Sequence, residues 1–138
     1  MRPENDNRRL LRARDRIDGA YAQPLDVPSL AHIALMSEAH FIRSFKATFG
    51  ETPHRYLQRR RVERAMFLLR YTDDSVTEIS IDVGFFSLGT FSRTFTEIVG
   101  ETPSRYRLRG SLGAVPTCFT KAWLRPSSFG EAVPAPRN

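Results

Sequence analysis

Apolar residues recur at three- and four-residue intervals along most of the chain, the spacing that places side chains on one face of a helix. This pattern predicts a helix over 7–21, two short helices within 27–49 and a long helix over about 53–70. The same order of two short helices and a third one returns between 75 and 109. No alternation of apolar and polar residues competes before residue 110. We therefore predict an all-α fold.

Two segments of the chain are copies of one another. Residues 41–56 and 91–106 are identical at nine of sixteen positions when aligned at an offset of 50. Farther upstream the alignment continues at an offset of 49, so the second copy contains one additional residue, which we assign to Phe86 in its turn. Two copies are too few for a solenoid, which usually needs at least three. The repeat instead predicts one module that is present twice.

Each copy carries the sequence signals of a helix-turn-helix. A serine precedes its second helix as an N-cap and a glycine ends that helix, in the pairs Ser37 with Gly50 and Ser87 with Gly100. A Thr-Pro dipeptide then starts the next helix, because proline is tolerated at the first helical position. We predict helix-turn-helix units over about 27–49 and 75–99, joined by the linker helix over about 53–70.

The charge of the chain indicates that this helical domain is a candidate DNA-binding domain. Its 21 basic residues exceed its 15 acidic ones, giving a net charge of +6, and 19 of the basic residues are arginine. The planar guanidinium group suits phosphates and guanine edges. A helix-turn-helix places its second helix in the major groove, with the early residues of that helix facing base edges. Double-stranded DNA is therefore the predicted partner.

Other functional classes find little support in the sequence. The single cysteine, Cys118, excludes an internal disulfide and a thiolate metal cluster, and the three histidines lack metal-ligand spacing. We find no paired acid and base and no phosphate-binding loop, so we expect neither an enzyme nor a cofactor. No apolar run is long enough to span a membrane, and the N-terminus has no apolar signal core. We expect a cytoplasmic protein.

The exposed faces of the two recognition helices supply the candidate contacts. An arginine such as Arg43 can donate two hydrogen bonds to guanine, while Ala39 and Ile42 suit thymine methyl groups. The candidate base contacts are Ala39, Ile42, Arg43, Lys46, Leu88, Thr90 and Arg93. The candidate contacts to the DNA backbone are Ser37, His40, Thr52, Arg55, Arg59, Arg60, Ser87, Ser92, Thr102 and Arg105. The arginines at 59–61 have a second interpretation, a solvated face in which one member pairs with a carboxylate.

The linker helix also predicts the form of the DNA site. About 18 residues of helix span about 27 Å, close to the roughly 34 Å between successive major-groove segments on one side of DNA. Both recognition helices would then bind one stretch of DNA of about 20 base pairs. Because the two units are tandem in one chain, this site should be asymmetric.

The repeated residues also carry a family resemblance. They are Ser37, Phe41, Arg43, Phe45, Gly50, Thr52, Pro53 and Tyr56 in the first copy, and Gly84, Phe85, Ser87, Phe91, Arg93, Phe95, Gly100, Thr102, Pro103 and Tyr106 in the second. With this pattern, residues 10–109 resemble the DNA-binding domain of the AraC/XylS family of bacterial transcription regulators. The resemblance implies a homeodomain-like fold of seven helices and a transcription regulator, with activation as its expected mode and RNA polymerase as a further partner. The sequence departs from the family at Leu35, where a small residue or glycine is common, and at Leu88 and Gly89, where polar residues are common.

The ends of the chain are assigned separately. We expect an N-terminal arm over 1–9 and a tail over 110–138, rich in proline and aromatic residues, that either packs on the domain or docks a partner. About 25 residues precede the first unit, too few for a ligand pocket, so we expect no small-molecule effector domain. Stand-alone members of the family act as monomers, and the resemblance implies the same here. The alternative function is a protein–protein interaction module with weak or non-specific DNA binding.

Overall fold

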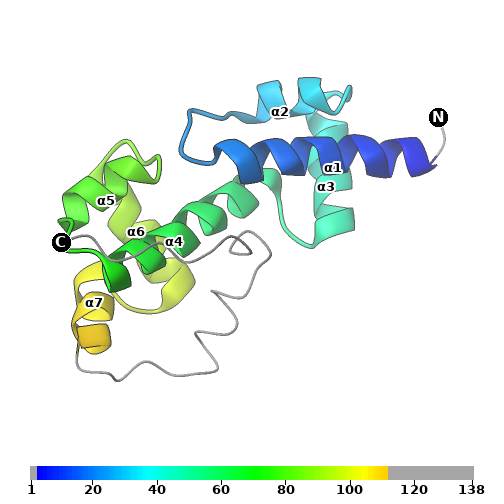
Figure 1. Cartoon of the computed structure of the whole chain (residues 1–138). Coiled ribbons are helices and arrows are strands. Elements are labelled where there is room, and N and C mark those ends of the chain that lie inside the picture. Colours follow the sequence, from blue (N-terminus) through cyan, green and yellow to red (C-terminus); the bar gives the residue numbers. More distant parts are fainter. Residues whose placement is uncertain (1–2, 112–138) are drawn as a thin grey trace. The chain divides into compact units, whose positions relative to one another are not determined.

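The computed structural model describes residues 3–111, which form seven helices and no strand (Figure 1). The helices are α1 (Pro3–Ala20), α2 (Val27–Ile33), α3 (Glu38–Phe49), α4 (Pro53–Tyr71), α5 (Val76–Asp82), α6 (Leu88–Val99) and α7 (Pro103–Ser111). The predicted all-α class and the seven helices are confirmed. None of the helices in this part of the chain is long and apolar enough to cross a bilayer.

The ends of two helices differ from the sequence prediction. The first helix begins at Pro3 and not near Asn7, so most of the segment expected as an arm is helical. The last helix reaches Ser111, two residues beyond its expected end at Arg109. The predicted tail, with Cys118, lies from residue 112 on outside the described residues.

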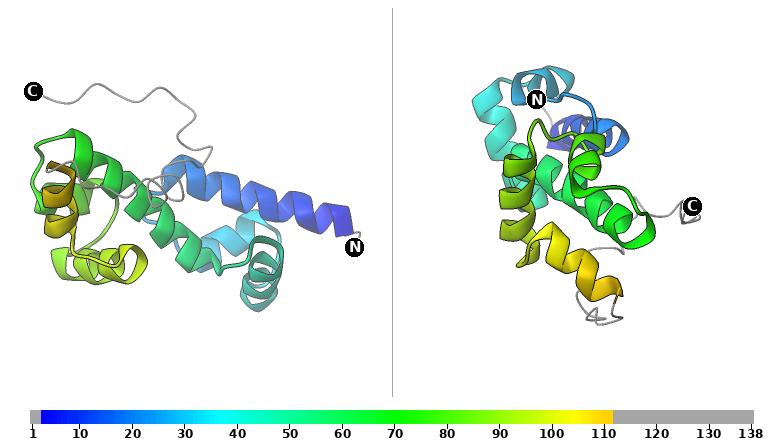
Figure 2. Two further views of the ribbon diagram at one scale, coloured as in Figure 1. Left: turned by 90° about the horizontal axis from the view of Figure 1, so that it is seen from below. Right: turned by 90° about the vertical axis from the view of Figure 1, so that its left-hand side faces the viewer.

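The chain divides into two compact units, an N-terminal unit up to residue 60 and a C-terminal unit from residue 61. Figure 2 shows α4 as one unbroken helix, and the division falls within it. Leu57 of this helix belongs to the core of the N-terminal unit, whereas Val62, Met66 and Leu69 belong to the core of the C-terminal unit. One helix thus supplies apolar residues to both cores.

The core of the N-terminal unit forms because three helices each bring an apolar stripe to it. α1 buries Leu10, Ala13 and Ile17, which follow one another at three- and four-residue spacing. α3 buries Phe41 and Phe45 against them, and α2 adds its own apolar residues. At about 25 cal/mol for each Å² of apolar surface removed from water, these large side chains dominate the stability of the unit.

The core of the C-terminal unit repeats this arrangement with different outer partners. α6 buries Phe91 and Phe95, and α5 buries Ile79 and Val83. Here α4 takes the place that α1 holds in the other unit, because its second half is buried on several sides. The Arg107 guanidinium closes the end of α4 by donating to the carbonyls of Leu69 (3.0 Å) and Thr72 (3.1 Å).

The two helix-turn-helix turns end their first helices with the same hydrogen bonds. The N–H of Met36 donates to the carbonyl of Ala31, and the N–H of Phe85 donates to the carbonyl of Ser80, both at 3.0 Å. This six-to-one bond requires a left-handed residue just before it. Gly84 fills that position in the second turn with φ 105°, but Leu35 fills it in the first with φ 57°. The second turn is also one residue longer, 83–87 against 34–37, which confirms the predicted insertion.

We predict that Leu35→Gly raises the free energy of unfolding by up to about 1 kcal/mol. A left-handed L-residue costs roughly 1–2 kcal/mol, and the greater freedom of glycine in the unfolded chain offsets only part of that relief. The side chain of Leu35 is 61% exposed, so little packing is lost. Urea denaturation measures the change.

Leu35→Ala is the control, because alanine keeps the Cβ atom and with it the strain. Gly84→Ala should lower the free energy of unfolding by about 1 kcal/mol or more for the same reason. A Leu35→Gly protein that is less stable than Leu35→Ala would contradict the strain argument.

Candidate nucleic-acid interface

The second helix of each unit is held by a ladder of three aromatic rings. In the N-terminal unit the ring centroids of Phe41 and Phe45 are 5.6 Å apart, and those of Phe45 and Tyr56 are 5.7 Å apart. In the C-terminal unit the rings of Phe91, Phe95 and Tyr106 repeat these spacings at 5.7 Å and 5.8 Å. Three of these pairs are edge-to-face and the Phe91–Phe95 pair is tilted, and such aromatic pairs contribute about 0.5–1.5 kcal/mol each beyond their buried area. The inner face of each helix is therefore fixed, and its opposite face is presented to solvent.

Both presented helices are capped at their N-termini as the sequence predicted. The Ser37 hydroxyl accepts from the N–H of His40 at 3.2 Å, and the Ser87 hydroxyl accepts from the N–H of Thr90 at 3.1 Å. Gly50 and Gly100 end the helices in left-handed conformation. Ser37, Ser87 and His40 are exposed, so the predicted backbone contacts among them are accessible.

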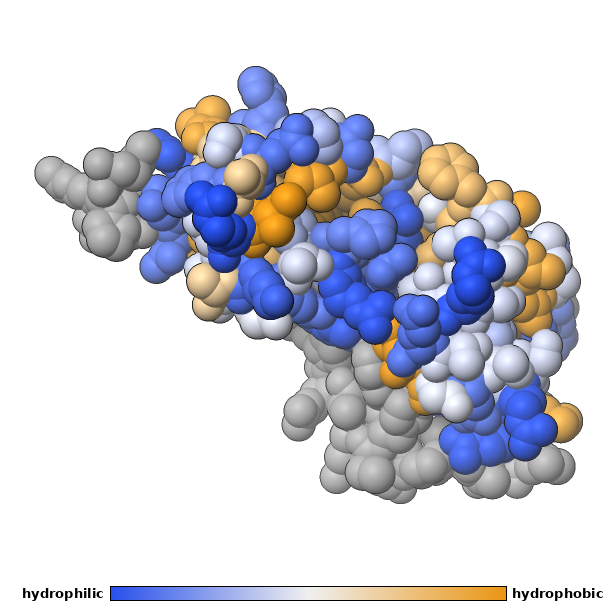
Figure 3. Space-filling view, turned by 180° about the vertical axis from the view of Figure 1, so that it is seen from behind, coloured by the Kyte–Doolittle hydropathy of each residue, from blue (hydrophilic) through white to orange (hydrophobic). Residues whose placement is uncertain are grey.

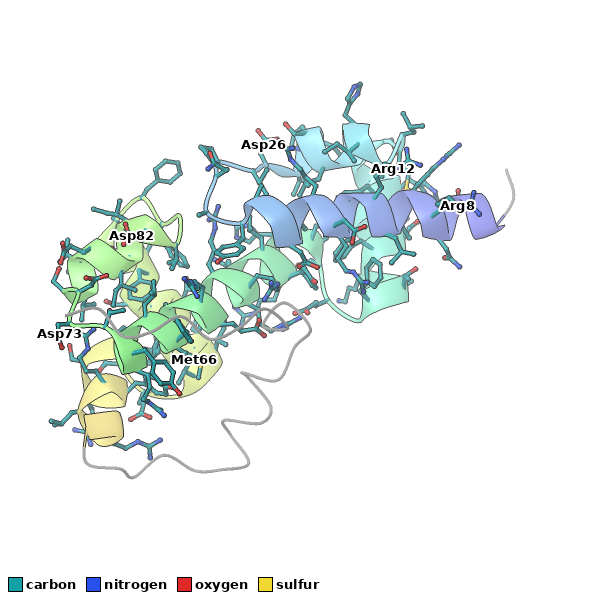
Figure 4. The ribbon with its side chains drawn as sticks, in the orientation of Figure 1. Arg8, Arg12, Asp26, Met66, Asp73 and Asp82 are labelled. Atoms are coloured by element: carbon teal, nitrogen blue, oxygen red, sulfur yellow. The ribbon has the colours of Figure 1, made fainter. Side chains whose placement is uncertain are left out.

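The outer face of α3 carries the four base contacts predicted for the N-terminal unit. Ala39, Arg43 and Lys46 are exposed, and Ile42 is half-buried beside them. This face combines two cations with small and branched apolar side chains. Two further arginines, Arg8 and Arg12, project from α1 into solvent (Figure 4). Neither of them was among the predicted contacts.

The outer face of α6 differs in charge and in shape. The Arg93 guanidinium donates to the Thr90 hydroxyl at 3.4 Å, so it is turned back along the first turn of its own helix. Its Nη1 lies 3.7 Å from the position that a Cβ atom on Gly89 would take. The Ser87 hydroxyl also donates to the Thr90 hydroxyl at 3.0 Å. Leu88 and Arg93 are exposed, while Thr90 and Ser92 are half-buried.

The helices that follow the two recognition helices begin at matching threonines. The Thr52 hydroxyl accepts from the N–H of Arg55, and the Thr102 hydroxyl accepts from the N–H of Arg105, both at 3.2 Å. The N-terminal turn of a helix favours anions, because its N–H groups and dipole point outward. Arg105 is exposed and Arg55 is half-buried, so an exposed cation stands beside the second of these turns.

Two of the predicted phosphate contacts have structural partners. Arg59 binds Glu51 at 2.7 Å, and the C-terminal unit repeats this pair as Arg109 with Glu101 at 2.8 Å. The arginine is the same in both copies at the offset of 50, a signal that lay just outside the compared segments. Each pair ties the turn after the recognition helix to the helix that follows. Arg59 remains partly accessible, and its contact with phosphate stays a prediction.

Arg60 pairs with a carboxylate, as the second interpretation of the arginines at 59–61 expected of one member, but it is buried. Its guanidinium is 5% exposed and binds Asp18 at 2.9 Å, and the Tyr56 hydroxyl donates to the same carboxylate at 2.8 Å. Burial, followed by the bond to Asp18, raises the pKa of Tyr56 far above its ordinary value. Arg60 is therefore a core residue and not the surface phosphate contact that was predicted. The sequence could not distinguish it from its neighbours, because burial of one arginine in a run depends on which way the helix faces.

Phe86 is the exposed residue that the sequence prediction passed over. It was identified only as the inserted residue of the second turn, and its side chain is 96% exposed. It also lies in an unusual stretch, since the chain has no lysine, arginine or histidine between Arg70 and Arg93. The acidic residues of this stretch include Asp73 and Asp82, which Figure 4 labels.

The face of the molecule in Figure 3 is mostly hydrophilic, with exposed apolar side chains in smaller groups.

Comparisons with known proteins agree with this geometry. Residues 30–109 match the family model described as a helix-turn-helix domain. An uncharacterized HTH-type transcriptional regulator of Haemophilus influenzae is 38% identical over 86 residues, which is 62% of this chain and 29% of that protein. The chain thus spans less than a third of that relative's length.

Two solved structures are similar over most of their own length. A transcriptional regulator with an AraC-type DNA-binding domain from Chromobacterium violaceum superimposes with a TM-score of 0.68 at 28% identity, covering 76% of this chain and 94% of the other. The DNA-binding domain of AdpA, a global transcriptional factor in complex with a target DNA, superimposes with a TM-score of 0.70 at 30% identity, covering 77% and 97%.

We predict that Arg60→Ala lowers the free energy of unfolding by about 2 kcal/mol, because it leaves Asp18 partly buried without its cation. Asp18 is 35% exposed, so the loss should be smaller than for a fully buried pair. Thermal or urea denaturation measures it, with the exposed Arg105→Ala as the matched control. A stable Arg60→Ala protein with weaker binding to every DNA sequence would restore the phosphate assignment.

We also predict that Gly89→Ala stabilises the protein by up to about 1 kcal/mol, because alanine favours the helix and its Cβ fits beside Arg93. Gly110→Ala is the contrasting control. A Cβ at Gly110 would lie 2.7 Å from Nε of Arg70, so Arg70 would have to move. If Gly89→Ala lowered the melting temperature, the described position of Arg93 would be wrong.

Proposed function

The chain belongs to the AraC/XylS-type helix-turn-helix family of DNA-binding transcription regulators, and we propose that it regulates transcription by binding an asymmetric DNA site through both of its units. One observation carries this proposal: each unit holds a capped second helix by its aromatic ladder and presents the opposite face to solvent. A rigidly held helix with an accessible outer face is what major-groove recognition requires. Two such helices in one chain make a second copy of the chain unnecessary, which favours a monomer.

In this proposal α3 provides most of the base recognition. The Arg43 guanidinium is exposed and can form the paired hydrogen bonds that distinguish guanine. Ala39 and Ile42 can contact thymine methyl groups, and Lys46 adds a second cation on the same face. α6 adds Leu88, Thr90 and Arg93, of which Arg93 must leave the Thr90 hydroxyl before it can reach a base.

The phosphate contacts position the protein and supply affinity that does not depend on sequence. The first turns of α4 and α7 offer N–H groups to phosphates, and Arg55 and Arg105 stand within these turns. Each cation that neutralises a phosphate releases counterions, so the binding should weaken steeply with salt. The proposed site covers about two helical turns, or about 20 base pairs. RNA polymerase bound at a nearby promoter is the proposed partner in transcription.

We predict that Arg43→Ala weakens binding by about 1–3 kcal/mol at the preferred site and changes it little on unrelated DNA, because the lost hydrogen bonds read a base. Arg105→Ala should weaken binding to all sequences alike and lower the slope of log K against log salt by about 1. Footprinting and titration at several salt concentrations, on a duplex selected from genomic fragments, measure both effects. Binding of equal strength to all fragments would contradict the proposed function.

A further inference from the structure

The most exposed large apolar side chain that the structure describes is Phe86. It is 96% exposed, and it directly precedes Ser87, the N-cap of α6. Leu88, the first residue of α6, is 43% exposed on the other side of that cap. Phe86 has no counterpart in the N-terminal unit, because its position is the inserted one. The second turn therefore adds an aromatic ring at the front of the recognition helix, and this ring takes almost no part in the packing of its own unit.

The stretch of sequence around Phe86 offers no cation to a phosphate or to a base, and its charged residues, Asp82 among them, are acidic. Residues 71–92 contain no cation, and Gly89 has no side chain. The nearest cation on α6 is Arg93, whose guanidinium is turned back onto the Thr90 hydroxyl. The front of α6 thus offers apolar carbon and the hydroxyls of Ser87 and Thr90. Apolar side chains at this position can bind favourably only to an apolar group. The C5-methyl of thymine is the apolar group that base edges present in the major groove.

We propose that Phe86, together with Leu88, selects thymine in the half of the DNA site bound by the C-terminal unit, by covering the thymine 5-methyl group. This inference rests on the proposed function and deepens it, since it names the chemistry that α6 reads. It also assigns the two units different work: α3 reads bases through hydrogen bonds from Arg43 as well as apolar contacts, whereas the front of α6 reads methyl groups.

The test removes single methyl groups from the DNA. A preferred duplex is first selected from a random pool with the full 138-residue chain. Each thymine is then replaced in turn by deoxyuridine, which lacks only the 5-methyl group and pairs in the same way. Burial of one methyl group corresponds to about a fourfold change in affinity, so one or two replacements should weaken binding about fourfold each.

The variant Phe86→Ala completes a double-mutant cycle. It should bind the selected duplex several-fold more weakly. The replacements that mattered to the wild type in the half of the site bound by the C-terminal unit should no longer matter to it. Thymines read by Ala39 or Ile42 should keep their effect in this variant, which provides an internal control. Ile81→Ala removes another exposed apolar side chain of the same unit, 63% exposed on α5, and should bind like the wild type. An unchanged melting temperature for Phe86→Ala, expected from its exposure, excludes a folding defect.

Several outcomes would overturn the inference. If no deoxyuridine replacement in the half of the site bound by the C-terminal unit weakens binding to a duplex that is still preferred, α6 does not read methyl groups, and the proposed function stands without this inference. If Phe86→Ala keeps both the affinity and the methyl discrimination of the wild type, Phe86 does not face DNA and the exposed ring is left for a protein partner. If the chain prefers no duplex from the pool, the proposed function itself fails, and this inference fails with it.

Discussion

The structure of each unit depends on the burial of a phenylalanine pair beneath its second helix. Each pair, Phe41 with Phe45 and Phe91 with Phe95, is fully buried, with its two rings one helical turn apart. The second ring of each pair contacts the ring of a tyrosine on the next helix. A helix with two large rings committed to a core cannot rotate about its own axis without exposing them to water. The burial of these rings therefore decides which residues of the helix face outward and which side chains it presents to solvent.

The tyrosine that completes each aromatic ladder has a different hydrogen-bond partner in each unit. In the N-terminal unit the Tyr56 hydroxyl donates to Asp18, which also binds the buried Arg60. In the C-terminal unit the Tyr106 hydroxyl accepts from Arg70, whose guanidinium lies 5.1 Å from the same ring. A buried polar group without a hydrogen-bond partner is costly, so the tyrosine hydroxyl has a charged partner in each copy of the repeat. The partner is an acidic acceptor in the first copy and a basic donor in the second. The two tyrosine rings pack in the same way, but the charged residue beside the hydroxyl differs between the two units.

The two recognition helices have kept their supports and diverged in what they present. Both retain a serine cap, the aromatic ladder and the glutamate–arginine pair behind them. Yet α3 presents Arg43 and Lys46 freely along its outer face, whereas α6 begins with Leu88 and Gly89 and holds Arg93 against Thr90. Selection on the supports and on the presented face is physically separable, because the two sets of side chains lie on opposite faces of one helix. The units can therefore present different side chains while they fold alike.

The sequence by itself determined the helices, the repeat, the caps and the turn insertion, because these follow from spacing and from residue types over a few positions. The outer faces of α3 and α6 were also predictable, since they are what remains once Phe41, Phe45, Phe91 and Phe95 turn inward. Only the tertiary structure decided the fate of individual charges. It buried Arg60 with Asp18, 42 residues away in the chain, and it turned Arg93 onto its own helix over Gly89. Such choices depend on which side chains meet in space, and no periodicity along the chain records that.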